Sequence, residues 1–278
     1  MTPQDARAAF AALVAQEEPH LDLARAALYI AAEEYPGLDV EGYLTRLHTM
    51  AEEAAARPLE APPPLGRLLA LNRYLFTERG FHGNTASYYD PRNSFLNEVL
   101  DRRTGLPITL AIVYLEVAWR LELPVAGVGM PSHFLVGYYG ADPPRYIDVF
   151  HRGALLSRED CAARLRVSFG EAFLFRDEHL APVTKRQILT RVLTNLKYVY
   201  HRQEDWGRAL GVIERLLLLQ PDAPAEVRDR GVVHLRRGAL RAARADLERY
   251  MRLAPRANDL RTVREQLALI DRLLVLRN

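Results

Sequence analysis

The sequence predicts an α+β protein that has N-terminal helices, one buried helix followed by a small antiparallel sheet, and a C-terminal module of helical repeats. Three observations support this class. The stretch 108–121 is apolar apart from Thr, Glu and Arg residues, which indicates a helix buried on most sides. Short segments rich in β-branched and aromatic residues follow it. From residue 184 onward the pattern is helical again, and Pro221 and Pro255 stand 34 residues apart.

Helical periodicity also dominates residues 4–57, where apolar positions recur every three or four residues. A cluster of prolines then interrupts the pattern, and we expect a further helix at about residues 65–77. The sequence therefore predicts an N-terminal helical region at residues 1–78, followed by a core at residues 79–182.

The buried helix of this core begins after Gly105, and Pro107 stands in its first turn, where proline is best tolerated. The composition then changes, and we predict strands at residues 125–129, 133–139 and 145–150. Turn-forming residues separate these strands, so consecutive strands are expected to pair in antiparallel fashion.

A turn between the second and third strands pairs residues whose numbers sum to about 281, which places His133 opposite Asp148 on one face. A carboxylate that fixes the tautomer of an imidazole serves acyl transfer when a nucleophile lies beside the ring. We therefore interpret His133 and Asp148 as a candidate catalytic dyad. The alternative is a structural pair that ties two strands together.

The nucleophile of such a site normally stands at a helix N-terminus, where the helix dipole lowers the pKa of a thiol. Pro107 holds that position here, and proline offers no acid, base or donor. The single cysteine, Cys161, lies beyond the strands and is interpreted as a packing residue. The hydroxyls of Ser94 and Thr109 are better placed, although hydroxyls in a first helical turn usually satisfy backbone groups. We leave the activity open and lean against an enzyme.

A metal site is a further alternative, because His133, Asp148 and His151 would supply two imidazoles and one carboxylate. No cysteine pair and no His-Glu-x-x-His motif accompanies them. We therefore expect no metal and no cofactor, and interpret His151 as a loop residue.

Polar residues just before the buried helix are candidates for ligand binding. Asn93 and Asn97 lie one helical turn apart and can line the same cleft as His133. Arg102 and Arg103, together with helix amides, can hold a carboxylate or phosphate. The alternative is a solvated, helix-capping surface. The candidate binding residues are Asn93, Ser94, Asn97, Arg103 and Thr109.

The spacing of the two C-terminal prolines is the period of a tetratricopeptide repeat, a helical hairpin that packs on its neighbours. Lys197 occupies a repeat position that holds Gly231 in the second repeat. The predicted module spans residues 184–278, with repeats at about 190–223 and 224–257 and a closing helix at about 260–276. Counting back from the prolines matches Ala209 with Ala243, Ile213 with Leu247, and Leu193 with Val227.

Many unlike residues in fixed order carry a family resemblance. The segments are YDPRNSFLNEVL at residues 89–100, RTGLPITL at 103–110, PSHFL at 131–135 and YID at 146–148. On these residues the chain resembles the SirB-type transglutaminase-like family. The resemblance implies a transglutaminase-like, papain-like core followed by tetratricopeptide repeats, as is common for this family in bacteria.

The resemblance also implies residue roles. The superfamily pattern of Gly, any residue, Cys, three residues and Ala lines up with Gly105, Pro107 and Ala111. His133 and Asp148 then match the catalytic histidine and aspartate, while proline replaces the cysteine, as it does in the SirB-type family itself. Thiol catalysis is therefore not expected.

The overall composition indicates which classes of partner are not expected. Lys and Arg total 37 against 35 Asp and Glu, so no global charge favours nucleic acid. The N-terminus lacks a signal-peptide pattern, and no apolar stretch approaches the ~20 residues of a membrane span. We expect a cytoplasmic protein.

Our leading hypothesis is a noncatalytic pseudoenzyme that binds a protein or peptide, or acts in regulation. The cleft around His133 and Asp148 and the repeat surface would be its binding sites. The rival is an amidohydrolase or acyl transferase that uses the His133-Asp148 dyad without a cysteine. A third hypothesis is a scaffold in which only the repeats matter.

Overall fold

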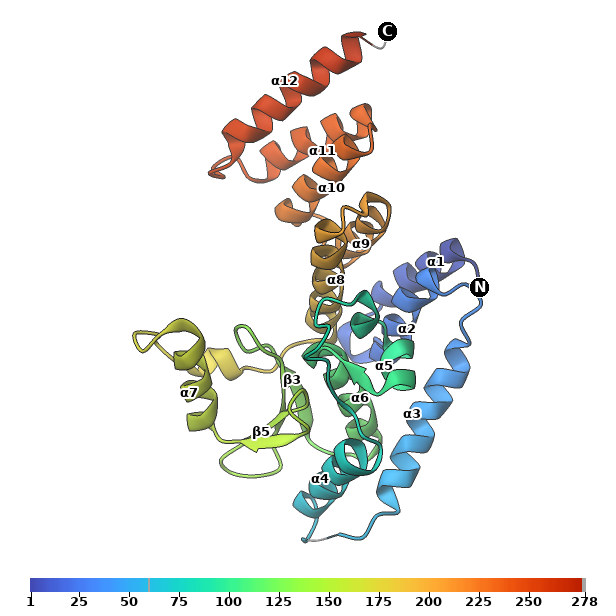
Figure 1. The fold of residues 1–278 in the computed structure, drawn as a ribbon, viewed down its shortest axis with the longest axis vertical. Helices are drawn as coiled ribbons and strands as arrows, with labels where there is room; N and C mark the ends of the chain where they lie inside the picture. Colours follow the sequence, from blue (N-terminus) through green and yellow to red (C-terminus); the bar gives the residue numbers. More distant parts are fainter. Residues whose placement is uncertain (60, 277–278) are drawn as a thin grey trace. The chain divides into compact units, whose positions relative to one another are not determined.

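The computed structural model describes residues 1–59 and 61–276, and Figure 1 follows the chain through them. The chain forms two compact units, the first spanning Met1–Val192 and the second beginning at Leu193. Helices dominate both units and a small antiparallel sheet lies in the first, so the predicted α+β class is confirmed.

Amphipathic helices open the first unit. Side chains just ahead of them satisfy the free amides of the first turns: Thr2 and Asp5 form a capping box, and Asp22 and Asp39 cap the next two long helices. The elements are α1 (Pro3–Val14), η1 (Glu18–His20), α2 (Leu23–Glu34), α3 (Val40–Ala55), α4 (Leu65–Asn72) and the π-helical turn η2 (Arg73–Glu78).

The central helix of this unit is α6 (Pro107–Arg120), with Pro107 at its first position as predicted. Its one buried acid, Glu116, accepts a hydrogen bond at 3.0 Å from the amide of Ala24 in the first turn of α2. Arg120 donates to the same carboxylate at 2.6 Å, so the charge is paired inside an apolar helix. The short elements η3 (Pro91–Ser94) and α5 (Leu96–Arg102) precede it.

The sheet has the order β3-β4-β5-β6 and is antiparallel throughout. Its three longer strands confirm the predicted ones. The strand β6 and a parallel pair, β1 with β2, were not predicted, because two or three residues carry no alternation to detect. The bounds are β1 (His82–Gly83), β2 (Thr104–Gly105), β3 (Val125–Val128), β4 (Leu135–Tyr138), β5 (Arg145–Asp148) and β6 (Ala154–Leu156).

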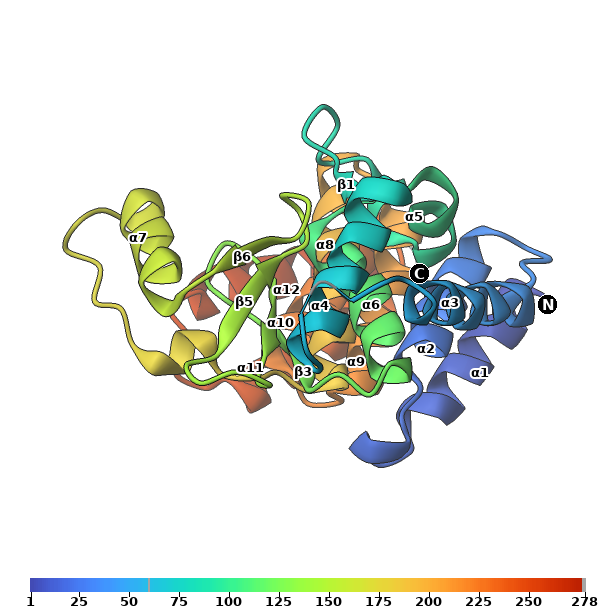
Figure 2. The same cartoon turned by 90° about the horizontal axis from the view of Figure 1, so that it is seen from below.

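The sheet lies between two helices, with α6 on one side and α7 (Arg158–Phe169) on the other (Figure 2). Cys161 and Leu165 of α7 pack against Leu135 and Leu156 of the strands in one apolar cluster. A short 3-10 helix, η4 (Asp177–Leu180), follows α7 and adds Leu180 to the same cluster.

The predicted register between the second and third strands was wrong by two residues. Val136 pairs with Ile147, whereas the predicted register would have paired it with Arg145. The turn is centred later than its glycine suggested. A shift of two residues keeps every side chain on its face, so His133 and Asp148 still share one side of the sheet.

The second unit is helical throughout the residues described. Helix α10 packs against α9 and α11, and α11 packs against α12. The matched small and large residues of the two repeats are fully buried, as the repeat pattern predicted. The helices are α8 (Lys185–Arg202), which begins in the first unit, α9 (Trp206–Leu219), α10 (Pro224–Arg236), α11 (Leu240–Leu253) and α12 (Leu260–Leu276).

Lys197 and Gly231 occupy the same repeat position for different reasons. A Cβ at Gly231 would lie 2.9 Å from Leu247, so the second repeat leaves no room for a side chain. Lys197 instead extends to α10, where Nζ lies 2.8 Å from carboxylate oxygens of both Glu226 and Asp229. Burial alone would lower the pKa of Lys197, but these two carboxylates raise it above its usual value.

Candidate functional site

Asp148 lies at the end of β5, is fully buried and accepts five hydrogen bonds. Its Oδ1 lies 2.9 Å from His133 Nε2 and accepts from the amides of Phe150 and His151, each at 3.2 Å. Its Oδ2 lies 2.7 Å from His151 Nδ1 and also accepts from the guanidinium of Arg164 on α7. The carboxylate is therefore saturated with donors.

His133 approaches this carboxylate from the turn that precedes β4. Ser132 takes a left-handed conformation with φ of 59°, and the amide of His133 donates to the carbonyl of Met130 at 3.1 Å. The imidazole remains 16% exposed, and its Nδ1 makes no hydrogen bond with any residue that the structure describes. The turn thus holds one ring nitrogen on Asp148 and leaves the other available.

The electrostatics favour an ionised Asp148. Burial alone would raise the pKa of this carboxyl group. The hydrogen bond and charge of His133, with the bonds from His151 and Arg164, outweigh burial and hold the pKa well below its usual range. Asp148 therefore stabilises cationic neighbours and does not itself act as a proton donor.

His133 lines a cavity of about 520 Å³ between the end of the sheet and α7, and Asp148 is buried behind it. The cavity combines a polar base with apolar side chains. Ser132 and Ser168 place hydroxyl-bearing side chains in its lining. The complete lining is Met130, Ser132, His133, His151, Ala163, Arg164, Val167 and Ser168.

Phe150 connects this site to the segment that precedes α6. Its ring centroid lies 6.3 Å from that of His133, and its carbonyl accepts from the amide of Gly83 at 3.0 Å. A Cβ at Gly83 would lie 2.3 Å from the Phe150 ring, so the strand must be glycine there. Gly83 pairs with Gly105, two residues before Pro107. The sheet end and the start of α6 are thus joined through one aromatic residue.

None of the residues considered as a nucleophile in the sequence analysis lies in the lining of this cavity. Pro107 is buried in the first turn of α6. Thr109 donates its hydroxyl to the carbonyl of Asn93 at 2.5 Å and is a structural cap. Ser94 Oγ is buried without a hydrogen-bond partner among the residues described.

Cys161 does not take over the role of the missing thiol. It is fully buried in the apolar cluster beneath α7, and burial raises the pKa of its thiol to about 12. A thiol with that pKa is protonated at neutral pH and is a poor nucleophile. The packing role predicted for Cys161 agrees with this environment.

The other predicted binding residues form a separate polar group. Asn93 is fully buried, donates to the carbonyls of Ser87 and Tyr88 at 2.7 and 3.2 Å, and accepts from Asn84 at 2.9 Å. Asn97 is buried on α5, while Arg103 caps α5 in a left-handed conformation and is exposed. None of them lines the cavity beside His133. Their role in binding stays a prediction.

The metal alternative has the right donors but an unfavourable charge. The ligand atoms of His133, Asp148 and His151 lie within 4.8 Å of one another. The oxygen that faces His151, however, is already paired with the Arg164 guanidinium, whose positive charge opposes a cation. We therefore retain the prediction that no metal binds here.

Sequence reasoning missed Arg164, Ser132, Ser168 and Arg191 as members of this region. Arg164 reaches Asp148 from α7, and Arg191 of α8 donates to the carbonyl of His133 at 3.2 Å. Periodicity could place Arg164 on a helix that also carries the buried Cys161 and Leu165, but nothing local in the sequence points to its partner.

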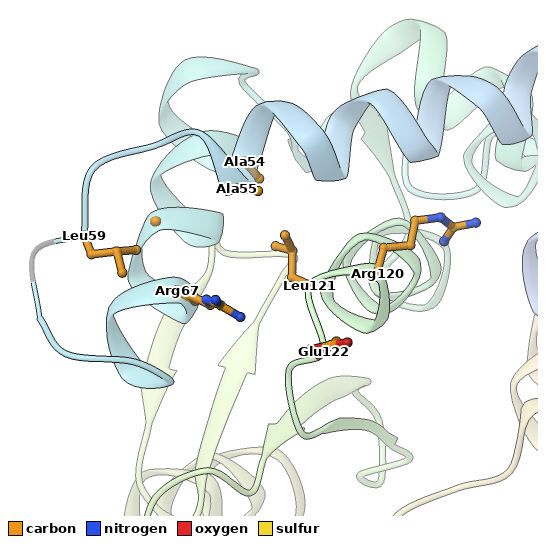
Figure 3. Close-up of a pocket in the computed structure, with 8 residues that line it drawn as sticks. Ala54, Ala55, Leu59, Arg67, Arg120, Leu121 and Glu122 are labelled. Atoms are coloured by element: carbon orange, nitrogen blue, oxygen red, sulfur yellow. The ribbon is translucent and has the colours of Figure 1, made fainter.

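A second cavity, of about 290 Å³, lies beside α4, where α3 and α6 end (Figure 3). Arg67 extends toward Leu121 in this view, and the lining also includes the apolar Leu59 and the charged Arg120 and Glu122. It shares no residue with the cavity at His133. Since no dyad or buried acid–base pair lines it, we assign the candidate site to the His133 cavity.

Comparison with known proteins places this geometry in a family. A model described as the transglutaminase-like superfamily matches residues 41–194, more than half of the chain. The chain belongs to this superfamily. A tetratricopeptide repeat model matches residues 196–268, so both parts of the predicted resemblance are confirmed.

Two bacterial relatives match most of this transglutaminase-like protein, and a mouse relative matches a third of it. It is 40% identical over 266 residues to a UPF0162 protein of Xylella fastidiosa, covering 92% of each chain. It is 28% identical over 236 residues to a UPF0162 protein of Vibrio cholerae, covering 84% of this chain and 87% of that one. F-box only protein 21 of the mouse is 38% identical over 100 residues, which is 33% of this chain and 16% of that protein.

Every helix in the described part of the chain is too short or too polar to span a lipid bilayer.

Proposed function

We propose that this protein is a noncatalytic member of the transglutaminase-like superfamily that binds a protein or peptide segment in the His133 cavity and acts in regulation. The observation that supports this most is that a histidine–aspartate pair and a cavity occur together in a site whose thiol position holds a proline. His133, which is bonded to the saturated Asp148 behind it, lines an open cavity, while a buried proline holds the position of the thiol. Such a cavity can bind a ligand without attacking it.

The shape and chemistry of the cavity fit a peptide. Its volume of about 520 Å³ falls in the range of small-ligand sites, and a peptide side chain with adjoining backbone fills such a volume. Val167, which lines it, is 88% exposed, and Phe169 and Leu174 are exposed nearby in sequence. Exposed apolar residues next to a polar pocket are typical of an interaction surface.

The repeats provide a second surface for a protein partner. Tetratricopeptide repeats bury one face of each hairpin and leave side chains on another face for binding. We propose that the repeats, at about residues 190–257 within the module from residue 184, bind the same partner as the cavity of the core at residues 79–182. We also propose a cytoplasmic location for this function, in agreement with a sequence that has a single cysteine.

Photo-crosslinking tests this proposal directly. A photoreactive amino acid is placed at Val167, beside the cavity, and at the exposed Thr49 of α3 as a matched control. We expect Val167 to form a discrete crosslinked species in cell extract from the source bacterium and Thr49 to form none. Introducing Ser168→Trp, which fills the cavity, should remove the species. Equal crosslinking at both positions, or crosslinking unaffected by the tryptophan, would contradict peptide binding in the cavity.

A second candidate function is hydrolysis or transfer of an amide or acyl group through the dyad and a hydroxyl. The observation that favours it is the presence of Ser132 and Ser168 in the same lining as His133. A fluorophosphonate probe distinguishes the two functions, because it modifies only an activated serine. Covalent labelling that is lost in His133→Ala and in one of the serine variants would establish the enzyme; an unlabelled protein supports the binding function.

A further inference from the structure

Arg191 is a cation without a carboxylate partner beside the candidate site. It is half-buried on α8, and its Nη2 donates to the carbonyl of His133 at 3.2 Å. Its Cζ lies 5.8 Å from the centroid of the Phe134 ring. No Asp or Glu in the described part of the chain forms an ion pair with it.

This isolation is unusual for a guanidinium that has lost part of its hydration. Buried charges are generally paired, since an uncompensated charge in a low-dielectric environment is destabilising. Arg164, the other arginine beside His133, follows this rule and pairs with the buried Asp148. Burial lowers the pKa of Arg191, and Tyr88 is the sole ionisable side chain among the described residues that counters this effect.

The position of Arg191 links it to the cavity. Its hydrogen bond to the His133 carbonyl fixes the guanidinium against the backbone of the residue that carries the imidazole. Tyr88 packs edge-on against Phe150 with centroids 6.1 Å apart, and Phe150 packs in the same way against His133 and His151. Tyr88 and the two histidines thus surround the Phe150 ring. Arg191 does not line the cavity itself, but it lies beside this group, because it bonds to the His133 backbone and interacts electrostatically with Tyr88.

We propose that Arg191 is the binding site for a carboxylate of the peptide ligand whose adjoining residues occupy the His133 cavity. This inference rests on the proposed peptide binding and adds the chemical class of the ligand. A guanidinium offers a planar fork of donors that matches a carboxylate with two parallel hydrogen bonds. The bond to the His133 carbonyl uses one nitrogen and leaves the others for the ligand.

The competing explanation is structural, with Arg191 only holding the turn before β4. The two explanations predict different effects of removing Arg191 on the thermal stability of the protein. If Arg191 serves a ligand, removal of its unpaired charge in Arg191→Met should leave the midpoint of thermal unfolding unchanged or higher. If it serves the turn, the midpoint should fall and the circular dichroism of the sheet should change.

Peptide pools provide the binding test. Three pools of N-acetylated random hexapeptides are passed over the immobilised full-length protein and quantified by mass spectrometry. The first pool lacks Asp and Glu and has an amidated C-terminus, the second contains Asp and Glu with the same amide, and the third lacks Asp and Glu but has a free C-terminal carboxylate. The second and third pools separate a side-chain carboxylate from a C-terminal one.

We expect wild-type protein to retain one of the two carboxylate pools about tenfold better than the first pool, because a charge-assisted hydrogen-bonded pair contributes this much discrimination. Arg191→Met should abolish the preference, Arg191→Lys should weaken it, and Arg166→Met should leave it unchanged. Arg166 is a matched control, since it is an exposed cation on α7 without an ion pair among the residues described.

The outcomes separate the inference from the function on which it rests. Equal retention of all three pools by wild-type protein would overturn the role of Arg191 and leave peptide binding in place. Retention of no pool would overturn both. A preference that survives in Arg191→Met, or that disappears equally in Arg166→Met, would also contradict the assignment. Equal retention by wild-type protein overturns the inference even if a variant fails to fold.

Discussion

Asp148 Oδ1 lies 2.9 Å from Nε2 of His133, although the two residues are not direct partners in the sheet. The turn before β4 carries His133 back over the end of β5, and Asp148 is held there by two amides of its own loop. The relationship therefore depends on loop geometry as well as on strand pairing.

Asp148→Asn should lower the free energy of unfolding by about 3 kcal/mol at pH 7, because it leaves the Arg164 and histidine donors without a buried anion. Urea titration measures this loss. Asp160→Asn is a matched control, since Asp160 is an exposed capping residue of α7. A loss no greater than that of the control would show that the buried carboxylate does not hold the cluster together.

The contribution of Asp148 should also depend on pH. Its pKa is lower in the folded protein than in the unfolded chain, where it is about 3.9. The stabilisation is therefore complete above about pH 5 and decreases as the pH falls below about 4 toward the folded pKa. The difference in unfolding free energy between wild type and Asp148→Asn should shrink over that acidic range. A difference that grows on acidification would mean that the sign of the shift is wrong.

Cys161 should resist alkylation in the folded protein. With a pKa of about 12, the thiolate is about one part in ten thousand at pH 8, and the side chain is fully buried. Iodoacetamide should modify it only after denaturation, which intact-mass measurement detects. Rapid modification of the native protein would indicate an accessible, activated thiol and would reopen cysteine chemistry.

Gly83→Ala should disturb His133 indirectly, through the Phe150 ring that lies between Gly83 and the imidazole. The added Cβ would lie 2.3 Å from the Phe150 ring, which packs against His133, so the ring must move. We expect a loss of about 1–3 kcal/mol in unfolding free energy, as for overpacked cores. We also expect a shift of the His133 imidazole resonances in NMR spectra. Gly207→Ala is the control, because its nearest neighbour would be 3.5 Å from the new Cβ.

Lys197→Met should destabilise the repeats by about 3 kcal/mol, since Glu226 and Asp229 would lose the cation that they share. Adding Glu226→Gln and Asp229→Asn to the same variant should recover most of this loss, because the two acids are then no longer charged. Thermal unfolding of the wild type, Lys197→Met and the triple variant checks the prediction. Failure of the added substitutions to recover stability would show that Lys197 contributes by packing rather than by charge.

Much of the fold could be predicted because its signals are local. The apolar run of α6, the alternation in β3 to β5 and the 34-residue spacing of Pro221 and Pro255 each identify an element directly. The strand β6 and the pair β1 and β2 could not be predicted, because two or three residues show no period. The register was two residues off, since a turn sequence does not fix where the turn is centred.

The site was less predictable, because its members come from distant segments. His133 and Asp148 were predicted as a pair from their order along the chain and from the face that they share. The structure joins their side chains by a hydrogen bond. Arg164 and Arg191 approach from α7 and α8 and bind the Asp148 carboxylate and the His133 carbonyl. No spacing in the sequence relates an arginine on a helix to a particular distant acceptor. Only packing brings these groups together.

One measurement tests most directly whether this transglutaminase-like site binds a ligand without catalysing a reaction. Purified wild-type protein and His133→Ala are incubated with the hexapeptide pools, with and without a primary amine, and the products are followed by mass spectrometry. We predict identical spectra for the two proteins, with no hydrolysed or amine-modified peptide above the buffer control. Product formed by wild-type protein and absent with His133→Ala would contradict the claim.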